Sequence, residues 1–146
     1  MTIAEPLSLH VLLIDDDPDH VLLVTRAIAR AVPRATTDAI DESSAALDRL
    51  RTMEPTPDLV LLDINMPGLS GLEVLAQLKA DARLARIPVV MLTSSELPTD
   101  IACAYERGAS GYISKGALAQ DLQVVLGHTL LYWSIMRRGA GGSGIQ

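Results

Sequence analysis

The chain has 146 residues, enough for one domain with a single sizeable core but too few for separate catalytic and regulatory modules. Its formal net charge is −6, which disfavours non-specific binding to nucleic acid because phosphate neutralisation needs clustered Lys and Arg. Aromatic residues make up only 3% of the chain and phenylalanine is absent, so we expect an aliphatic core and no platform for stacking bases.

Short aliphatic runs bounded by Pro, Gly or acidic residues alternate with helical patterns along the chain. The runs predict five strands, at residues 10–14, 35–40, 58–62, 88–92 and 111–114. A helical pattern follows each run, beginning near Pro18, Ala45, Leu72, Pro98 and Leu118. Five such units in one small domain predict an α/β fold, with a parallel sheet covered by helices on both faces.

The last helix is predicted to run from Leu118 to Arg138, about 21 residues or roughly 30 Å, which is longer than a small sheet needs. It carries two apolar stripes. One stripe comprises Leu118, Leu122, Val125 and Thr129, and the other comprises Leu126, Leu130, Trp133 and Arg137. Residues 139–146 contain nothing to bury and predict a disordered tail, so the domain is expected to span residues 1–138.

Only one stripe of this helix can face the core, so the other is exposed unless a partner covers it. We therefore predict a homodimer, with Leu126, Leu130 and Trp133 at the interface. The alternative is a single wide stripe in which Trp133 folds back on the core.

Other features exclude further classes of protein. The single cysteine, Cys103, cannot form an intrachain disulfide or a cysteine-ligated zinc site. No apolar run approaches the ~20 residues of a membrane span. Residues 1–8 lack the basic flank and apolar stretch of a signal peptide, so we expect a cytoplasmic protein.

Acidic residues follow the first and third predicted strands at their carboxyl ends, where parallel sheets bind ligands. Asp15 and Asp16 end the first run, and Asp63 ends the third. If these strands are neighbours, the carboxylates converge and repel one another unless a cation compensates them. Oxygen ligands with room for water suit Mg²⁺, and the backbone carbonyl of Asn65 would supply a further oxygen.

The ends of the fourth and fifth predicted strands add hydrogen-bond donors, a hydroxyl and an ammonium group. The sequence contains two lysines, of which Lys79 is expected to be solvated on a helix and Lys115 to lie at the mouth of the site. Lys115, a metal ion and the hydroxyl of Thr93 would bind the oxygens of a phosphoryl group on Asp63. This set indicates phosphoryl transfer to a carboxylate. A phosphatase is disfavoured because such enzymes commonly need a second acid where Asn65 stands.

Four segments match a known family in order and spacing: Val11–Asp16, Asp58–Gly68, Pro88–Ser94 and Gly108–Lys115. Over about residues 9–127 the sequence resembles the receiver domain of two-component response regulators. The resemblance implies a chemotaxis-receiver-like (βα)5 fold, flavodoxin-like and doubly wound, with strand order 2-1-3-4-5 and an extended last helix. It also implies a histidine kinase as partner.

The resemblance assigns roles to individual residues. Asp63 becomes the phosphoacceptor, and Asp15 and Asp16 hold magnesium together with the carbonyl of Asn65. Thr93 becomes the switch hydroxyl, Lys115 the partner of the phosphoryl group, and Tyr112 the switch aromatic. Such a protein assists its own phosphorylation and signals through protein contacts, so we do not expect an enzyme acting on an external substrate.

Three features narrow the resemblance. Receivers usually carry proline after the lysine, where this chain has Gly116, which leaves the usual cis peptide at Lys115–Gly116 in question. The missing proline, the long last helix and the lack of an output module resemble the small stand-alone receivers paired with bacteriophytochromes, red-light-sensing histidine kinases. The alternative is a receiver-like interaction scaffold that is never phosphorylated, but a scaffold would need none of the pocket residues.

Overall fold

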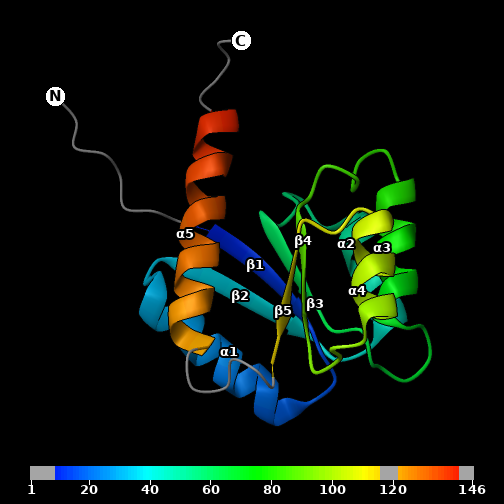
Figure 1. Ribbon diagram of the computed structural model, residues 1–146. Coiled ribbons are helices and arrows are strands. Elements are labelled where there is room, and N and C mark those ends of the chain that lie inside the picture. The colour runs from blue at the N-terminus through cyan, green and yellow to red at the C-terminus, as the bar shows by residue number, and fades with distance from the viewer. Residues whose placement is uncertain (1–8, 116–121, 142–146) are drawn as a thin grey trace, which may run out of the picture.

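The computed structural model describes residues 9–115 and 122–141, and within these ranges it has alternating strands and helices (Figure 1). The strands are β1 (Leu9–Ile14), β2 (Ala35–Ile40), β3 (Leu59–Leu62), β4 (Val89–Thr93) and β5 (Gly111–Ser114). The helices are α1 (Pro18–Ala31), α2 (Ser43–Thr52), α3 (Gly71–Ala80), α4 (Pro98–Glu106) and α5 (Leu122–Gly141). Each predicted strand is confirmed to within one residue at its ends.

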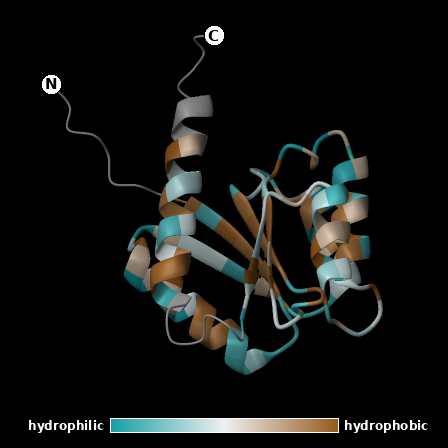
Figure 2. Cartoon of the chain, viewed as in Figure 1, coloured by the Kyte–Doolittle hydropathy of each residue, from teal (hydrophilic) through white to brown (hydrophobic). Residues whose placement is uncertain are grey.

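All strand pairings in the sheet are parallel, and the order β2-β1-β3-β4-β5 confirms the predicted doubly wound topology. The central strands are hydrophobic along their length (Figure 2), and every residue of β3 is buried. Strand β2 is only half-buried, as expected of an edge strand. The point where the strand order reverses lies between β1 and β3, so the topology places a ligand site there.

Helices cover the sheet on both faces, with α1 and α5 on one face and α2, α3 and α4 on the other (Figure 1). Within the described part of the chain, side chains of α1 and α5 share one aliphatic cluster with one face of the sheet. The opposite cluster joins the other face to α2, α3 and α4. Asp17 caps α1, because its side chain accepts hydrogen bonds from the amides of Asp19 and His20.

Helix α5 ends later than predicted. Its described part begins at Leu122 and continues to Gly141, so residues 139–141 are helical and not part of a disordered tail. Glycine costs a helix only about 1 kcal/mol per residue, so two glycines near its end need not stop it. The predicted first turn, residues 118–121, and the tail from 142 lie outside the described residues. None of the described helices is long and apolar enough to cross a membrane.

The two stripes of α5 lie differently from the prediction. Leu126 and Leu130 are fully buried against the chain's own core, and Trp133 packs partly against the same cluster. The predicted dimer interface is therefore wrong for both leucines, which are covered within the monomer. The exposed apolar side chains of α5 are instead Val124, Leu131, Tyr132, Ile135 and Met136.

Adjacent leucines on α5 allow a direct test of this orientation. We expect Leu130→Ala to lower the free energy of unfolding by about 2–5 kcal/mol, because Leu130 is fully buried and its loss leaves a cavity. Leu131→Ala, at a side chain that is 43% exposed, should cost less than about 1 kcal/mol. Urea denaturation of both variants measures the difference, and equal losses would contradict the orientation.

Candidate metal and phosphoryl site

The carboxyl edge of the sheet gathers the predicted site residues. Asp15 directly follows β1 and Asp63 directly follows β3, and these two strands are hydrogen-bonded neighbours. The amide of Asp63 donates to the carbonyl of Ile14 at 3.0 Å, which fixes the end of β3 beside the end of β1. Lys115 follows β5, and its amide donates at 2.8 Å to the carbonyl of Thr93, the last residue of β4.

Three carboxylates converge at this edge. One oxygen each of Asp15, Asp16 and Asp63 lies within 4.8 Å of the others, close enough to share a metal ion. Asp15 and Asp63 are buried, with 0% and 6% exposure, whereas Asp16 is exposed to solvent. The group therefore offers hard oxygen donors on one side and access for water on the other, which is the environment that Mg²⁺ and related cations prefer.

Lys115 lies within the same cluster. Its Nζ donates to Asp15 Oδ2 at 2.6 Å and to Asp63 Oδ2 at 3.4 Å, and its side chain is only 5% exposed. Among the described residues, three carboxylates and one ammonium meet here, so two negative charges stay uncompensated when all four groups are ionised. A divalent cation would neutralise them, and the donor set therefore fits a metal ion.

The backbone around Asp63 is closely packed. The amide of Asn65 donates to Asp63 Oδ1 at 3.3 Å, and the amide of Gly71 donates to the carbonyl of Ile64 at 2.8 Å. A Cβ at position 71 would overlap the backbone carbonyl of Asp63, so α3 can begin here only with glycine. Gly71 thus brings the start of α3 against the phosphoacceptor candidate, a role that the sequence analysis did not assign to it.

Thr93 and Tyr112 lie at the β4–α4 loop. Thr93 is fully buried, and its Oγ1 accepts a hydrogen bond from the amide of Ser95 at 3.3 Å. The Tyr112 hydroxyl donates to the carbonyl of Ser95 at 2.9 Å. Burial raises the pKa of this hydroxyl, and the side chain of Ser95 opposes the rise. Carboxylates of three acidic residues add to it, those of Asp100, Asp63 and Glu96.

Sequence reasoning missed two further pairs in this loop. The Ser95 hydroxyl donates to Asp100 Oδ2 at 2.6 Å, and the Ser114 hydroxyl donates to Glu96 Oε2 at 2.9 Å. Neither pair has a sequence signal. Leu97 and not Ser95 is the N-cap of α4, so the Ser95–Asp100 pair is not a capping box. The Ser114–Glu96 pair depends on the register between β4 and β5.

The other lysine is not solvated as predicted. Lys79 Nζ donates to the carbonyls of Ala85 and Ile87, at 3.0 and 2.8 Å, so it fastens the segment between α3 and β4. Burial lowers the pKa of this ammonium group. Lys79 is therefore engaged in structure away from the carboxylates.

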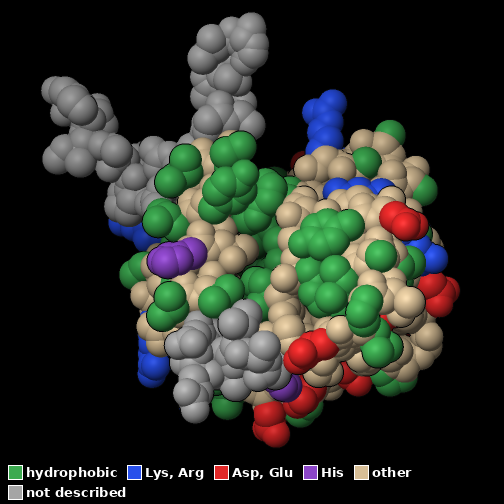
Figure 3. Space-filling view, viewed as in Figure 1, with side chains coloured by type: hydrophobic (Ala, Val, Ile, Leu, Met, Phe, Trp, Pro, Cys, Tyr) green, Lys and Arg blue, Asp and Glu red, His purple; other side chains and the backbone are tan. Residues whose placement is uncertain are grey.

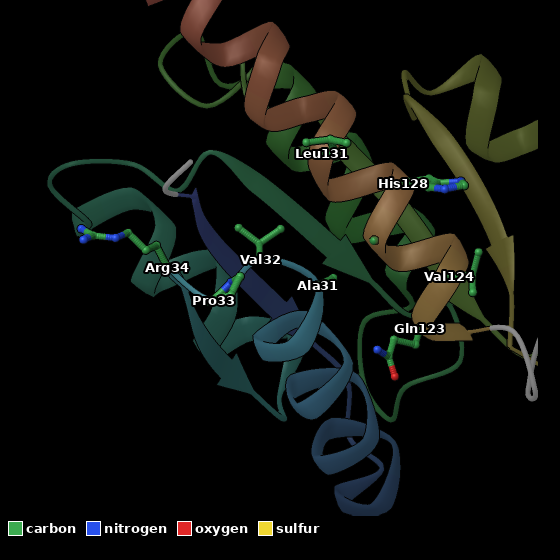
Figure 4. Close-up of a pocket in the computed structure, with 9 residues that line it drawn as sticks. Ala31, Val32, Pro33, Arg34, Gln123, Val124, His128 and Leu131 are labelled. Carbon is green, nitrogen blue, oxygen red and sulfur yellow. The ribbon is translucent and has the colours of Figure 1, made fainter. Parts of the chain in front are cut away.

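A cavity of about 670 Å³ lies between the end of α1 and α5, away from the acidic edge (Figure 4). Its polar side chains do not converge. Arg34 points away from α5, Gln123 lies beside α1, and His128 lies on the opposite side of α5 (Figure 4). This cavity thus lacks the convergent polar groups that a ligand site needs.

The topology and the acidic edge together define a doubly wound α/β domain with a metal-type site at its switch point. Residues 11–126 match the family described as "Response regulator receiver domain". A match over most of the chain shows the family, and the chain belongs to it. This confirms the resemblance seen in the sequence and places the chain among signalling domains.

Relatives agree with this assignment. The "Probable methanogenesis regulatory protein FilR2" of Methanothrix harundinacea is 35% identical over 135 residues, which cover 90% of this chain and 87% of the relative. The solved structure described as the phosphorylated cyanobacterial phytochrome response regulator RcpA has a TM-score of 0.80 at 30% identity, covering 86% of this chain and 94% of that one. The Mn²⁺-bound form of response regulator Rcp1 has a TM-score of 0.77 at 31% identity, with the same coverage.

The close contact at Gly71 can be tested directly. We expect Gly71→Ala to cost about 1–3 kcal/mol of stability, because the added methyl group forces the Asp63 backbone to move. Divalent-cation affinity should fall with it, since Asp63 shifts relative to Asp15. The matched control is Gly111→Ala, where a Cβ would make only ordinary contacts with Val90. Urea denaturation and magnesium titration compare the two variants, and equal behaviour would refute the constraint.

Proposed function

We propose that the protein is a cytoplasmic, single-domain response regulator that accepts a phosphoryl group on Asp63 from a sensor histidine kinase, in a magnesium-dependent reaction. The observation that supports this most strongly is the convergence of Lys115 with Asp15 and Asp63 inside a group of three carboxylates. A scaffold that never carries phosphate has no use for this arrangement, because burying these charges costs free energy without a ligand to stabilise them.

Each residue has a distinct part in the proposed transfer. A carboxylate oxygen of Asp63 attacks the phosphorus of the donor phosphohistidine, the P–N bond breaks, and its electron pair stays on the imidazole. Asp15, Asp16 and the carbonyl of Asn65 would hold Mg²⁺ beside Asp63. When bound, the ion supplies positive charge to the phosphoryl oxygens. Lys115 leaves its ion pair with Asp15 and donates to the same oxygens.

Thr93 and Tyr112 carry the response. The Thr93 hydroxyl turns from the Ser95 amide towards the phosphoryl oxygens, and Tyr112 repacks behind it. The β4–α4 loop thereby moves from one position to another. The signal passes to other proteins through the altered surface. The protein assists its own phosphorylation and dephosphorylation and converts no external substrate.

The kinase partner is proposed to be of the phytochrome type. The support is the similarity to RcpA, a phytochrome response regulator by its description, over 94% of that chain. The position of Gly116 in place of the usual proline also supports this pairing.

Phosphorylation by a small-molecule phosphodonor tests the central claim. With Mg²⁺ present, we expect the wild type to gain the mass of one phosphoryl group, and Asp63→Asn or removal of the metal by a chelator to abolish the gain. Intact-protein mass spectrometry measures the product. A mass gain that persists in Asp63→Asn would rule out this residue as the acceptor, and rapid hydrolysis of generic phosphate esters would favour a phosphatase.

Two variants separate the roles within the site. Asp16→Ala should weaken both magnesium binding and phosphorylation, because it removes a proposed ligand. Lys115→Ala should preserve magnesium binding, since it removes a cation from a site with excess negative charge, yet slow phosphorylation. If magnesium affinity also collapses in Lys115→Ala, the role given to Lys115 is wrong.

The exposed face of α5 supports a homodimer. Residues 122–136 contain no Asp, Glu, Lys or Arg, although the chain carries a net charge of −6. Two copies repel least where they meet on this uncharged face.

Hydrophobic side chains on α5 and α4 flank a hollow in Figure 3. This groove of about 730 Å³ is lined by all four aromatic residues of the chain, Tyr105, Tyr112, Tyr132 and Trp133. Aromatic side chains contribute strongly to interfaces.

Sedimentation tests this pairing. We expect the wild type to form dimers at micromolar concentration, and Ile135→Ser, which places a hydroxyl on the exposed face of α5, to be monomeric with unchanged stability. The matched control is Leu22→Ser on α1, a residue of similar exposure outside this face, which should remain dimeric. A wild type that is monomeric with and without phosphorylation would contradict the dimer.

A further inference from the structure

Strand β5 and the residue that follows it hold the β4–α4 loop at three points. The Lys115 amide donates to the carbonyl of Thr93, the last residue before the loop. The Tyr112 hydroxyl donates to the carbonyl of Ser95. The Ser114 hydroxyl donates to Glu96 Oε2 at 2.9 Å. Thr93 and Ser114 are also paired across β4 and β5. The Ser114–Glu96 hydrogen bond therefore links the strand partner of Thr93 to the loop that follows Thr93.

The Glu96–Ser114 hydrogen bond differs from the other two because its acceptor is an ionised side chain. Carboxylate acceptors make stronger hydrogen bonds than neutral oxygens, but they also respond to any charge that appears nearby. This hydrogen bond also ends next to the phosphoryl site, because Ser114 directly precedes Lys115, whose Nζ lies 3.4 Å from Asp63 Oδ2. With Mg²⁺ already bound, phosphorylation replaces the single charge of the Asp63 carboxylate with about −1.5 to −2 at neutral pH, so the edge becomes more negative than in the metal-bound, unphosphorylated protein.

We propose that the Glu96–Ser114 hydrogen bond is a latch that holds the β4–α4 loop in its unphosphorylated position, and that the charge of a phosphoryl group on Asp63 opens it. Glu96 and Ser114 are then positioning residues, which act on the reaction through Thr93. The inference rests on the proposed phosphorylation of Asp63 for its opening step, whereas the latch in the unphosphorylated protein stands on the geometry alone.

The two ends of the latch can be changed independently. Ser114→Ala removes the donor but leaves the charge of Glu96 in place. Glu96→Gln keeps an oxygen that can accept from Ser114 but removes the charge. Both side chains are partly or fully exposed, so neither change disturbs the core. Matched controls are Ser110→Ala at the other end of β5 and Glu106→Gln at the end of α4, both of which are exposed.

Hydrogen exchange of residues 94–97, followed by mass spectrometry, reads out the loop. Its amides report directly, because those of Ser95 and Leu97 donate to side-chain oxygens within the loop. Without phosphodonor, we expect Ser114→Ala to exchange about three- to tenfold faster than wild type, and Glu96→Gln and both controls to exchange like wild type. Relative to Mg²⁺ alone, phosphodonor with Mg²⁺ should raise exchange fully in wild type and controls. The rise should be smaller in Glu96→Gln, where the Thr93 hydroxyl still leaves the Ser95 amide but no charge opens the latch.

The outcomes separate the latch from the proposed function. A wild type that takes up no phosphoryl group overturns the proposed function and the opening step together. If the wild type is phosphorylated but Ser114→Ala exchanges like Ser110→Ala, only the latch is overturned. If Glu96→Gln responds to phosphorylation as fully as wild type does, the charge of Glu96 does not open the loop, and the electrostatic step is wrong.

Discussion

The ammonium group of Lys115 lies 2.6 Å from one buried carboxylate and 3.4 Å from another, although these three residues are far apart in the sequence. Parallel pairing makes this possible, because it aligns the carboxyl ends of β1, β3, β4 and β5 at one edge. Much of the remaining structure serves this alignment. The main-chain hydrogen bond from Asp63 to Ile14 sets the spacing between Asp15 and Asp63. The main-chain hydrogen bond from Lys115 to Thr93 sets the position of the lysine.

The carboxylates of this cluster repel one another. Burying carboxylates beside one another is unfavourable, and a single lysine compensates only part of their charge. The same imbalance makes the edge receptive to a divalent cation and, once that is bound, to the oxygens of a phosphoryl group. Two further acids lie close by, Glu96 in the β4–α4 loop and Asp100 in the first turn of α4, and each accepts a hydrogen bond from a serine hydroxyl. A change of charge at Asp63 therefore also changes the electrostatic potential at these two carboxylates.

The strands, and the edge at which Asp15, Asp16 and Asp63 gather, were predictable because each depends on short-range patterns. Buried aliphatic runs ending in Asp15, Asp63 and Thr93 specify both the strand and the edge where its last side chain lies. The orientation of α5 was not predictable, because helical periodicity gives two candidate stripes and does not rank them. Tertiary contact decides between them, and a Cβ at Gly127 would lie 3.3 Å from Ala31 of α1, so this glycine allows the close approach that turns Leu126 and Leu130 inward.

The distribution of aromatic side chains has a spectroscopic consequence. The chain contains one tryptophan, three tyrosines and no phenylalanine, and all four aromatic residues line the groove between α4, β5 and α5. Tyr132 and Trp133 stack edge to face with ring centroids 5.0 Å apart. Near-ultraviolet absorption, circular dichroism and intrinsic fluorescence of this protein all originate on one side of the molecule. Native chromophores thus report on the groove between α4, β5 and α5 without any introduced label.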